Sequence, residues 1–417
     1  MKELNFDIAV IGGGAAGCMA AIRSGALKKR VVLIERNDSI GKKILITGRG
    51  RCNLTNTAPI ETFIKNFGRR GEFLRSAFFA FFNEDLIEFF RAAGLDTKAE
   101  RQGRVFPATD SARSVVDTLK RCLSENGVRV IYNARLRDIY PEAGAFRLQT
   151  ELGESIRSSK VILATGGSSY EATGSTGDGF VLAEKLKHKM VPLEPGLVPL
   201  RTKETWVKDL QGLGLENVRI SFECGKKKIV SEIGELMFTH FGVSGPLVLD
   251  LSSDVLGLAK DPAREVKLFI DLKPAVTAVQ IETRLLNAFK QKGKTQFKNV
   301  MKDFLPQRLI DVFIKLSDIK PEREACQVTQ KERKAIVALF KGLPLTVIGS
   351  LPLEEAMVTG GGVSTKDINP RTMESRVVPG LYFAGEIIDG SAASGGYNLQ
   401  QAFSTGWLAG DSAAKGA

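Results

Sequence analysis

The chain opens on an apolar run that gives way to a glycine-rich turn and then to a helical pattern. Residues 8–11 are apolar and mostly β-branched, which predicts a strand buried on both faces. Residues 18–26 have helical periodicity, and residues 30–34 form a second apolar run. Strand, helix and strand in this order predict a βαβ unit, and therefore an α/β protein with a parallel sheet.

The turn in this unit carries the spacing Gly12-x-Gly14-x-x-Gly17. Gly12 permits a tight turn, Gly14 lets a pyrophosphate approach the backbone, and Gly17 lets the helix pack closely on the strand. Glu35 ends the second strand, where a carboxylate would accept the ribose hydroxyls of a dinucleotide. A glycine-rich turn without a ligand is the alternative. The residues assigned to cofactor binding here are Gly12, Gly14, Ala15, Ala16, Gly17, Glu35 and Arg36.

Three later segments favour FAD over NAD as the cofactor. Residues 160–164 form a short apolar strand before a glycine turn, residues 380–386 repeat that pattern, and residues 395–402 open a helix with two glycines. A return of the C-terminus to the cofactor resembles the two-part site of glutathione-reductase-type FAD domains. For each piece alone, a buried strand and a turn is the alternative. The residues assigned from these segments are Thr165, Gly166, Gly167, Gly385, Glu386, Gly395, Gly396, Tyr397, Asn398 and Leu399.

The pattern of residue types changes three times along the chain, as expected for 417 residues in more than one domain. Prolines and short alternating runs after residue 190 predict a small β-rich insert that resembles a barrel. Helical periodicity follows from residue 276. We expect the first part of the FAD domain at 1–190, the β-rich insert at 191–275, a helical insert at 276–345 and the second part of the FAD domain at 346–417.

Cysteine and histidine are too few and too scattered for a metal site or a disulfide framework. The five cysteines lack paired ligand spacing, and there are only two histidines. The N-terminus begins with a strand pattern, and there is no apolar run of 18 residues. We therefore expect a cytoplasmic protein with no metal and no membrane span; the number of subunits is left open.

Positive charge is unevenly distributed along the chain. The net charge is +12, and residues 284–341 contain 14 Lys or Arg against 6 Asp or Glu. Clustered basic residues are typical of surfaces that bind nucleic acids. A solvated surface that aids solubility is the alternative.

Residues 41–56 combine glycines, basic residues and a cysteine. Such a loop lets the main chain approach a ligand while cations neutralise phosphate. Cys52 lies between Arg51 and Asn53, and nearby cations would lower its pKa and make it usable as an acid or nucleophile. An inert buried side chain is the alternative. The cofactor residues assigned from this loop are Lys42, Lys43, Gly48, Arg51, Cys52 and Asn53.

Two further segments hold candidate residues for the reaction. His240 lies in a glycine-rich turn near Gly242 and Gly245, which makes it a candidate proton donor or a structural histidine. Arg101 and Arg104 could meet an anionic substrate or lie in an ordinary surface loop.

Together, the GxGxxG turn, the Arg-Cys-Asn-Leu-Thr-Asn block at 51–56, Gly-Arg-Val-Phe-Pro at 103–107, the 238–246 turn and the Gly385–Gln400 region resemble the BaiN/RdsA-type family of NAD(P)/FAD-dependent oxidoreductases. The resemblance spans nearly the whole chain. It implies a Rossmann-like FAD domain interrupted by a β-barrel and a helical subdomain. Activities linked to the family include ribosomal RNA dihydrouridine synthesis, reduction of bile-acid intermediates and aminoacetone oxidation.

The basic charge favours an RNA substrate among these activities. The leading hypothesis is an FAD-dependent oxidoreductase that reduces a uridine of 23S rRNA to dihydrouridine, with Cys52 as the proton donor. No second GxGxxG is present, so NADPH or NADH would bind transiently as the reductant. The alternatives are a small-molecule flavoenzyme, either an amine oxidase or an enoate or steroid-type reductase, and a non-catalytic RNA-binding factor stabilised by FAD.

Overall fold

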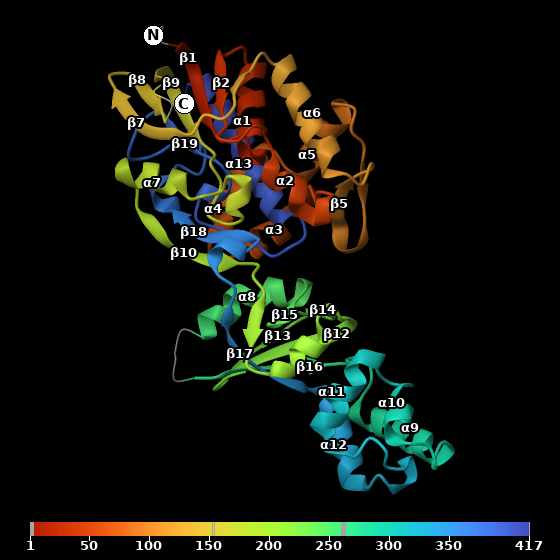
Figure 1. The fold of residues 1–417 in the computed structure, drawn as a ribbon. Coiled ribbons are helices and arrows are strands. Elements are labelled where there is room, and N and C mark those ends of the chain that lie inside the picture. The colour runs from red at the N-terminus through yellow and green to blue at the C-terminus, as the bar shows by residue number, and fades with distance from the viewer. Residues whose placement is uncertain (1–3, 152, 154, 260–263, 417) are drawn as a thin grey trace. The chain divides into compact units, whose positions relative to one another are not determined.

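Strands from both ends of the chain belong to one sheet (Figure 1). The computed structural model describes residues 4–151, 153, 155–259 and 264–416. It divides into unit 1, which comprises Met1–Gly196 and Leu353–Ala417, and unit 2, which comprises Leu197–Pro352. Along the chain, unit 2 is therefore an insertion between the two segments of unit 1.

The main sheet of unit 1 consists of β1 (Leu4–Ile11), β2 (Val31–Ile34), β6 (Arg129–Ile131), β7 (Leu136–Glu142), β8 (Ala145–Thr150), β9 (Ser155–Leu163) and β19 (Leu381–Phe383). The strand order is β6-β2-β1-β9, and β19 pairs with the last part of β9. These five strands are all parallel, whereas the β7–β8 hairpin extends the first part of β9 in an antiparallel direction. The apolar run at 8–11 is buried on both faces, as its composition requires.

Parallel register brings the carboxyl ends of four strands to one edge of this sheet. Ile11 lies opposite both Ile34 and Leu163, and Leu163 lies opposite Phe383. The turns after β1, β2, β9 and β19 are therefore neighbours, although the first and the last are more than 300 residues apart in sequence. Ligands of open α/β sheets bind at this edge.

The helices of unit 1 are α1 (Ala15–Ala26), α2 (Lys42–Ile46), α3 (Ile60–Asn66), α4 (Gly71–Ala80), α5 (Asn83–Ala92), α6 (Ala112–Glu125), α7 (Asp178–Lys185) and α13 (Tyr397–Lys415). Two small antiparallel sheets complete the unit: β3 (Thr55–Asn56) with β5 (Arg104–Pro107) and β4 (Thr97–Ala99), and β10 (Met190–Gly196) with β18 (Val358–Val363). None of the described helices is both long and apolar enough to cross a bilayer.

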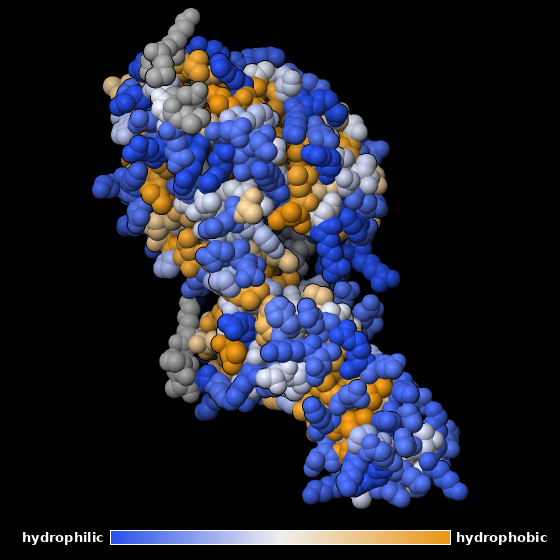
Figure 2. Space-filling view, viewed as in Figure 1, coloured by the Kyte–Doolittle hydropathy of each residue, from blue (hydrophilic) through white to orange (hydrophobic). Residues whose placement is uncertain are grey.

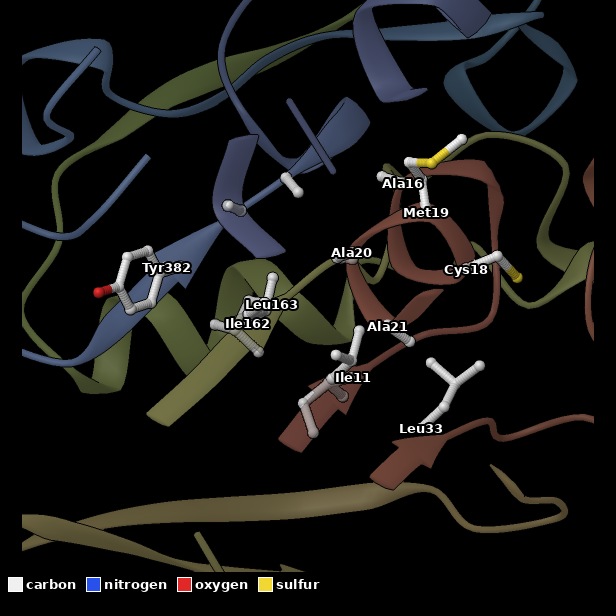
Figure 3. Packing of buried hydrophobic residues seen from close by; sticks show 14 of the residues in the cluster. Ile11, Ala16, Cys18, Met19, Ala20, Ala21, Leu33, Ile162, Leu163 and Tyr382 are labelled. Atoms are coloured by element: carbon white, nitrogen blue, oxygen red, sulfur yellow. The ribbon is translucent and has the colours of Figure 1, made fainter. Parts of the chain in front are cut away.

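Two glycines on the C-terminal helix explain how it packs so closely on α1. A Cβ atom at Gly406 would lie 2.3 Å from the carbonyl oxygen of Ala16, and one at Gly410 would lie 2.4 Å from that of Ala20. Only glycine permits this approach. Figure 3 shows Ala16 and Ala20 on α1 above the strand that carries Ile11, within the buried core of unit 1. This contact ties the two ends of the chain together beside the sheet.

Unit 2 contains a sheet that closes on itself. Its strands are β11 (Leu200–Thr202), β12 (Gly214–Cys224), β13 (Lys227–Val230), β14 (Gly234–Phe238), β15 (Gly242–Ser244), β16 (Val266–Asp271) and β17 (Leu343–Ser350). The order is β13-β12-β14-β15-β11-β17-β16, and β16 pairs in turn with β12. This additional pairing closes a barrel, with β13 attached to β12 outside the ring.

The helices of unit 2 are α8 (Pro246–Leu258), α9 (Ala278–Gln291), α10 (Phe297–Met301), α11 (Gln307–Ser317) and α12 (Gln330–Lys341). The structure differs from the expected divisions at 275 and 345. Leu285 and Phe313 of the helices share one buried core with Ile220 of the barrel, so the two parts form a single unit. The expected return at residue 346 falls inside β17, which pairs with both β16 and β11.

Candidate cofactor and active site

A cavity opens at the carboxyl edge of the parallel sheet in unit 1. Its walls come from the turns after β1, β2, β9 and β19, from α2 and from the first turns of α13. It encloses about 1340 Å³, open solvent at its mouth included. A lining drawn from four strand ends and two helices suits an extended ligand that contacts several elements at once, such as a dinucleotide.

The three glycines of the first turn differ in their steric surroundings. Gly12 has a φ of +102°, and a Cβ there would lie 2.5 Å from the carbonyl oxygen of Ala164. A Cβ at Gly17 would lie 1.8 Å from the carbonyl oxygen of Gly12, so this glycine permits close packing of helix on strand. A Cβ at Gly14 would meet no atom within 4 Å. Gly14 thus borders open space, where a ligand can approach the backbone.

The start of α1 provides a site for an anion. Ala15 and Ala16 line the cavity, and the first turn of the helix contains no acidic residue. Backbone N–H groups at this position have no partner within the helix, and the helix dipole favours negative charge there. Thr165 also lines the cavity, and its buried Oγ1 has no hydrogen-bond partner in the described structure. These features fit the pyrophosphate of FAD.

Glu35 is buried and fixed in orientation at the end of β2. Its Oε2 accepts from the Gly13 backbone N–H at 2.7 Å, and its Oε1 accepts from the backbone and side-chain nitrogens of Asn37, both at 2.8 Å. Because Oε2 has a single protein donor, it can also accept from a ribose hydroxyl. The carboxylate thus fits the ribose role predicted from its position in the sequence.

Two arginines and an aspartate line the cavity beyond Glu35. Arg135 contacts both carboxylate oxygens of Asp178 at 2.7 Å, and Arg36 contacts the same carboxylate at 3.0 Å. The hydrogen bond from Arg135 lowers the pKa of Asp178, so this carboxylate stays charged. Arg135 and Asp178 are not among the residues assigned from the sequence. The glycine-rich turn at 174–179, which contains this aspartate, was the available signal.

The opposite end of the cavity holds an ion pair between the two segments of unit 1. Lys43 Nζ lies 2.7 Å from Glu386 Oε2 and 2.8 Å from the hydroxyl of Ser169. The other oxygen of Glu386 accepts from the Thr359 backbone N–H at 2.8 Å. Both charged side chains are mostly buried, so solvent screens their attraction only partly. This arrangement fixes the loop after β19 against α2.

The Asn residues of the 51–56 block bind the second glycine turn. Asn56 Nδ2 donates to the carbonyl of Gly395 at 3.0 Å. In the amide orientation that its neighbours require, Asn53 accepts from the Gly396 N–H at 3.0 Å. A Cβ at Gly396 would also lie 2.3 Å from the carbonyl oxygen of Thr55. The block therefore positions the start of α13, whose Asn398 and Leu399 line the cavity.

Arg51 does not neutralise phosphate at this cavity, contrary to expectation. Its guanidinium is bound by Glu100 and by Asp110 and lies 4.1 Å from the centre of the Phe106 ring. The two carboxylates satisfy its charge, and its side chain does not line the cavity. The acids that hold it lie about 50 and 60 positions away in the sequence, so the local loop pattern could not indicate them.

The structure does not show the lowered pKa expected for Cys52, whereas its role as proton donor stays a prediction. The Cys52 side chain is fully buried in the core of unit 1, and burial raises its pKa to about 12. The hydrogen bond with Thr47 offsets this only in part. Cys52 does not line the cavity, although Thr47 does. Arg51, the cation beside it in sequence, pairs with Glu100 and Asp110 instead, so desolvation decides the protonation of Cys52.

Cavity lining separates the remaining predicted cofactor residues into two groups. Those that line the cavity are Gly12, Gly14, Ala15, Ala16, Glu35, Arg36, Lys42, Lys43, Thr165, Gly166, Gly385, Glu386, Asn398 and Leu399. Those that do not line it are Gly17, Gly48, Arg51, Cys52, Asn53, Gly167, Gly395, Gly396 and Tyr397. The second group shapes the turns; for example, a Cβ at Gly167 would lie 2.3 Å from Thr359 Oγ1.

His240, the other candidate proton donor, belongs to unit 2. It is exposed on the turn between β14 and β15, with its ring 4.9 Å from that of Phe241. All residues that line the cavity belong to unit 1. The role of His240 in proton transfer stays a prediction. Arg101 and Arg104 do not line the cavity either.

The parallel sheet, the glycine turn and the fixed carboxylate define a protein with a dinucleotide-binding Rossmann-like domain. A family model described as the HI0933-like protein Rossmann domain matches residues 6–412. The chain therefore belongs to the HI0933-like family, and it is an FAD-dependent oxidoreductase.

Two curated relatives and one solved structure illustrate the similarity. The chain is 32% identical over 411 residues to the 3-dehydro-bile acid delta(4,6)-reductase of Clostridium scindens. The aligned region covers 98% of this chain and 99% of that protein. It is 31% identical over 404 residues to the ribosomal RNA dihydrouridine synthase of Escherichia coli, which covers 96% of both chains. The 3-ketosteroid delta1-dehydrogenase of Sterolibacterium denitrificans shares the fold, with a TM-score of 0.55, 12% identity, and coverage of 99% of this chain and 100% of that one.

Proposed function

We propose that this protein reduces a uridine of 23S ribosomal RNA to dihydrouridine, with NADPH or NADH as a transient electron donor. The names of the two curated relatives both denote reduction of a carbon–carbon double bond. In uracil the corresponding bond is C5–C6, which accepts a hydride at C6 and a proton at C5. FAD held in the cavity of unit 1 would supply the hydride.

The residues of the cavity would hold the two ends of FAD in place. Glu35 and the start of α1 suit the ribose and the pyrophosphate. The Lys43–Glu386 ion pair and the first turn of α13 form the other end of the cavity. Cys52 is fully buried and does not line the cavity, so we assign it a packing role in place of the predicted role as proton donor.

The basic charge of unit 2 carries the choice of an RNA substrate. Residues 284–341 contain 14 Lys or Arg against 6 Asp or Glu, within a chain of net charge +12. A polyanion gains affinity from such a surface through release of its counterions, whereas a small substrate does not need it. All five cysteines are free thiols, which is typical of a reducing, cytoplasmic location. An RNA substrate fits such a location.

Reduction of a small enone is the second candidate function. The relative that is 32% identical is named as a bile acid reductase. The cavity also has apolar side chains such as Ile44, Met357 and Leu399 in its wall, which suit an apolar substrate. On this alternative the positive charge of unit 2 would play no part in catalysis.

Mass-spectrometric mapping of rRNA nucleosides would separate the two functions. We expect 23S rRNA from cells without the gene to lack one dihydrouridine, and the wild-type gene to restore it. Purified protein should also produce dihydrouridine in that rRNA with NADPH or NADH. Intact dihydrouridine in the deletion strain would overturn the proposal, and turnover of a steroid enone by the purified protein would then favour the alternative.

A further inference from the structure

The end of α9 and the following turn form a segment with unusual charge. Residues 290–302 contain five lysines and no Asp or Glu. Lys290, Lys294 and Lys302 are exposed, and Lys298 is half-buried. Lysines at every fourth position would repel one another within one helix, but here α9 ends at Gln291 and α10 begins only at Phe297. The charge is therefore spread over a turn and two helix ends.

Backbone hydrogen bonds place a second basic segment beside this one. The N–H of Lys298 donates to the carbonyl of Pro321 at 3.2 Å, and that of Phe297 donates to the carbonyl of Arg323 at 2.8 Å. The N–H of Cys326 donates in turn to the carbonyl of Gly293 at 3.1 Å. Residues 290–302 and 320–326, here called the basic tip, thus form one surface with seven basic and two acidic residues.

Most of this charge is not neutralised within the described structure. Lys292 pairs with Asp303 at 2.6 Å, and Arg323 pairs with Glu332. None of the other basic residues of the tip forms an ion pair with a described residue: Lys290, Lys294, Lys298, Lys302 and Lys320. By contrast, Arg30, Arg51 and Arg135 in unit 1 are all bound to carboxylates.

The surface around the tip favours RNA over a membrane. Among the described residues between 280 and 347, no large hydrophobic side chain is exposed, although Val279 and Ile348 at the margins are. Figure 2 shows mainly hydrophilic residues over α9 on the visible face. Proteins that lie on membranes combine basic residues with exposed apolar ones. The tip has the charge without the apolar side chains.

We infer that the basic tip binds the phosphate backbone of the RNA substrate, and this inference rests on the proposed function. Lysine contacts to phosphates position an RNA without reading its sequence. The basic tip would therefore determine the affinity for large rRNA, whereas the reduction would take place at the cavity of unit 1.

A triple variant tests this role. The tip variant combines Lys294→Gln, Lys298→Gln and Lys320→Gln, which together remove three unpaired charges. The barrel variant is its control and combines Lys203→Gln, Lys226→Gln and Lys227→Gln, which remove the same charge from exposed positions on the barrel. Binding to deproteinised, unreduced 23S rRNA is measured over a range of KCl concentrations. We expect the slope of log Kobs against log[KCl] to become shallower by about 2–3 in the tip variant, at roughly 0.7–0.9 for each phosphate contact. The barrel variant should keep the wild-type slope.

Steady-state kinetics give the second measurement. The tip variant should show a KM for 23S rRNA raised at least about tenfold, with kcat and the rate of flavin reduction by NADPH unchanged. A wild-type slope and KM in the tip variant would overturn the inference while leaving the proposed function intact. If wild-type protein neither binds nor reduces the rRNA, both proposals fail. Equally tight, equally lysine-dependent binding to phosphatidylglycerol vesicles would contradict RNA as the partner.

Discussion

The ammonium group of Lys43 lies 2.7 Å from a carboxylate oxygen of Glu386, a residue 343 positions further along the chain. Both side chains line the same cavity. One comes from the helix after the second strand and the other from the turn after the last strand. The pair therefore marks the place where the two ends of the chain meet around the candidate cofactor site.

Removing one member of this pair should lower the free energy of unfolding more than removing both. Lys43→Met leaves the mostly buried Glu386 carboxylate without its counter-charge, so we expect lower stability and weaker FAD binding. The double variant Lys43→Met/Glu386→Gln should recover part of the loss. A double-mutant cycle by urea unfolding of the apoprotein should give a coupling of about 1–3 kcal/mol. Strictly additive effects would show that the two groups do not interact.

Alanine substitutions at two glycines of the first turn should have different consequences. A Cβ at Gly14 meets only open space in the protein, so Gly14→Ala should change stability by less than about 1 kcal/mol. It should still weaken FAD binding at least about tenfold, because the methyl group occupies the approach of the pyrophosphate. FAD titration of the apoprotein measures this loss.

Gly17→Ala is the matched control for this substitution. Its Cβ would lie 1.8 Å from the carbonyl oxygen of Gly12, so the variant should unfold at much lower urea concentration or fail to fold. If Gly14→Ala bound FAD as tightly as wild type, the cavity would not hold the pyrophosphate at this turn.

Cys52→Ala should reveal a packing role. Loss of the buried sulfur leaves a small cavity, so we expect a free energy of unfolding lower by about 1–2 kcal/mol. Stopped-flow rates of flavin reduction by NADPH and of flavin reoxidation by substrate should both stay close to wild type. A large loss in the second step alone would restore Cys52 as the proton donor.

His188 should make the protein less stable in mild acid. It is buried, its Nδ1 lies 3.1 Å from the carbonyl oxygen of Ala183, and its Nε2 lies 2.7 Å from the hydroxyl of Ser375. Burial lowers its pKa, although Asp367 and the Ala183 carbonyl act in the opposite direction. Between this lowered pKa and the unfolded value near 6.5, the unfolded chain binds more protons than the folded chain. The free energy of unfolding therefore falls as pH drops below about 6.5.

Urea unfolding at a series of pH values between 5 and 7 measures this effect. The chain has only two histidines, and the other, His240, is exposed, so the slope in this range can be assigned. In His188→Gln the slope should largely disappear, at some loss of stability. His240→Gln is the control and should keep it. An unchanged slope in His188→Gln would contradict the assignment.

The parts of the site that lie close together in sequence could be predicted from it. The spacing of Gly12, Gly14 and Gly17 predicts their steric surroundings, and the place of Glu35 follows from the end of the next strand. The roles of Arg51 and Cys52 could not be predicted in this way. Each depends on distant groups: the carboxylates that bind the arginine, and the core that encloses the thiol.

The asparagines at 53 and 56 show a second limit. Their pattern in the sequence was recognised, but their function depends on contact with Gly395 and Gly396, more than 300 positions away. The structure differs from the predicted boundary after the helical insert for a similar reason. The alternating strand at 343–350 closes the barrel, and only its partners in unit 2 reveal which domain it belongs to.

The absorption spectrum of the purified protein tests the central claim most directly, namely that both ends of the chain enclose one FAD. We predict the visible absorption bands of a bound flavin and about one FAD released per chain on denaturation. Gly14→Ala, purified in the same way, should be folded and largely colourless. A folded wild-type protein that remains colourless after incubation with excess FAD would contradict the account.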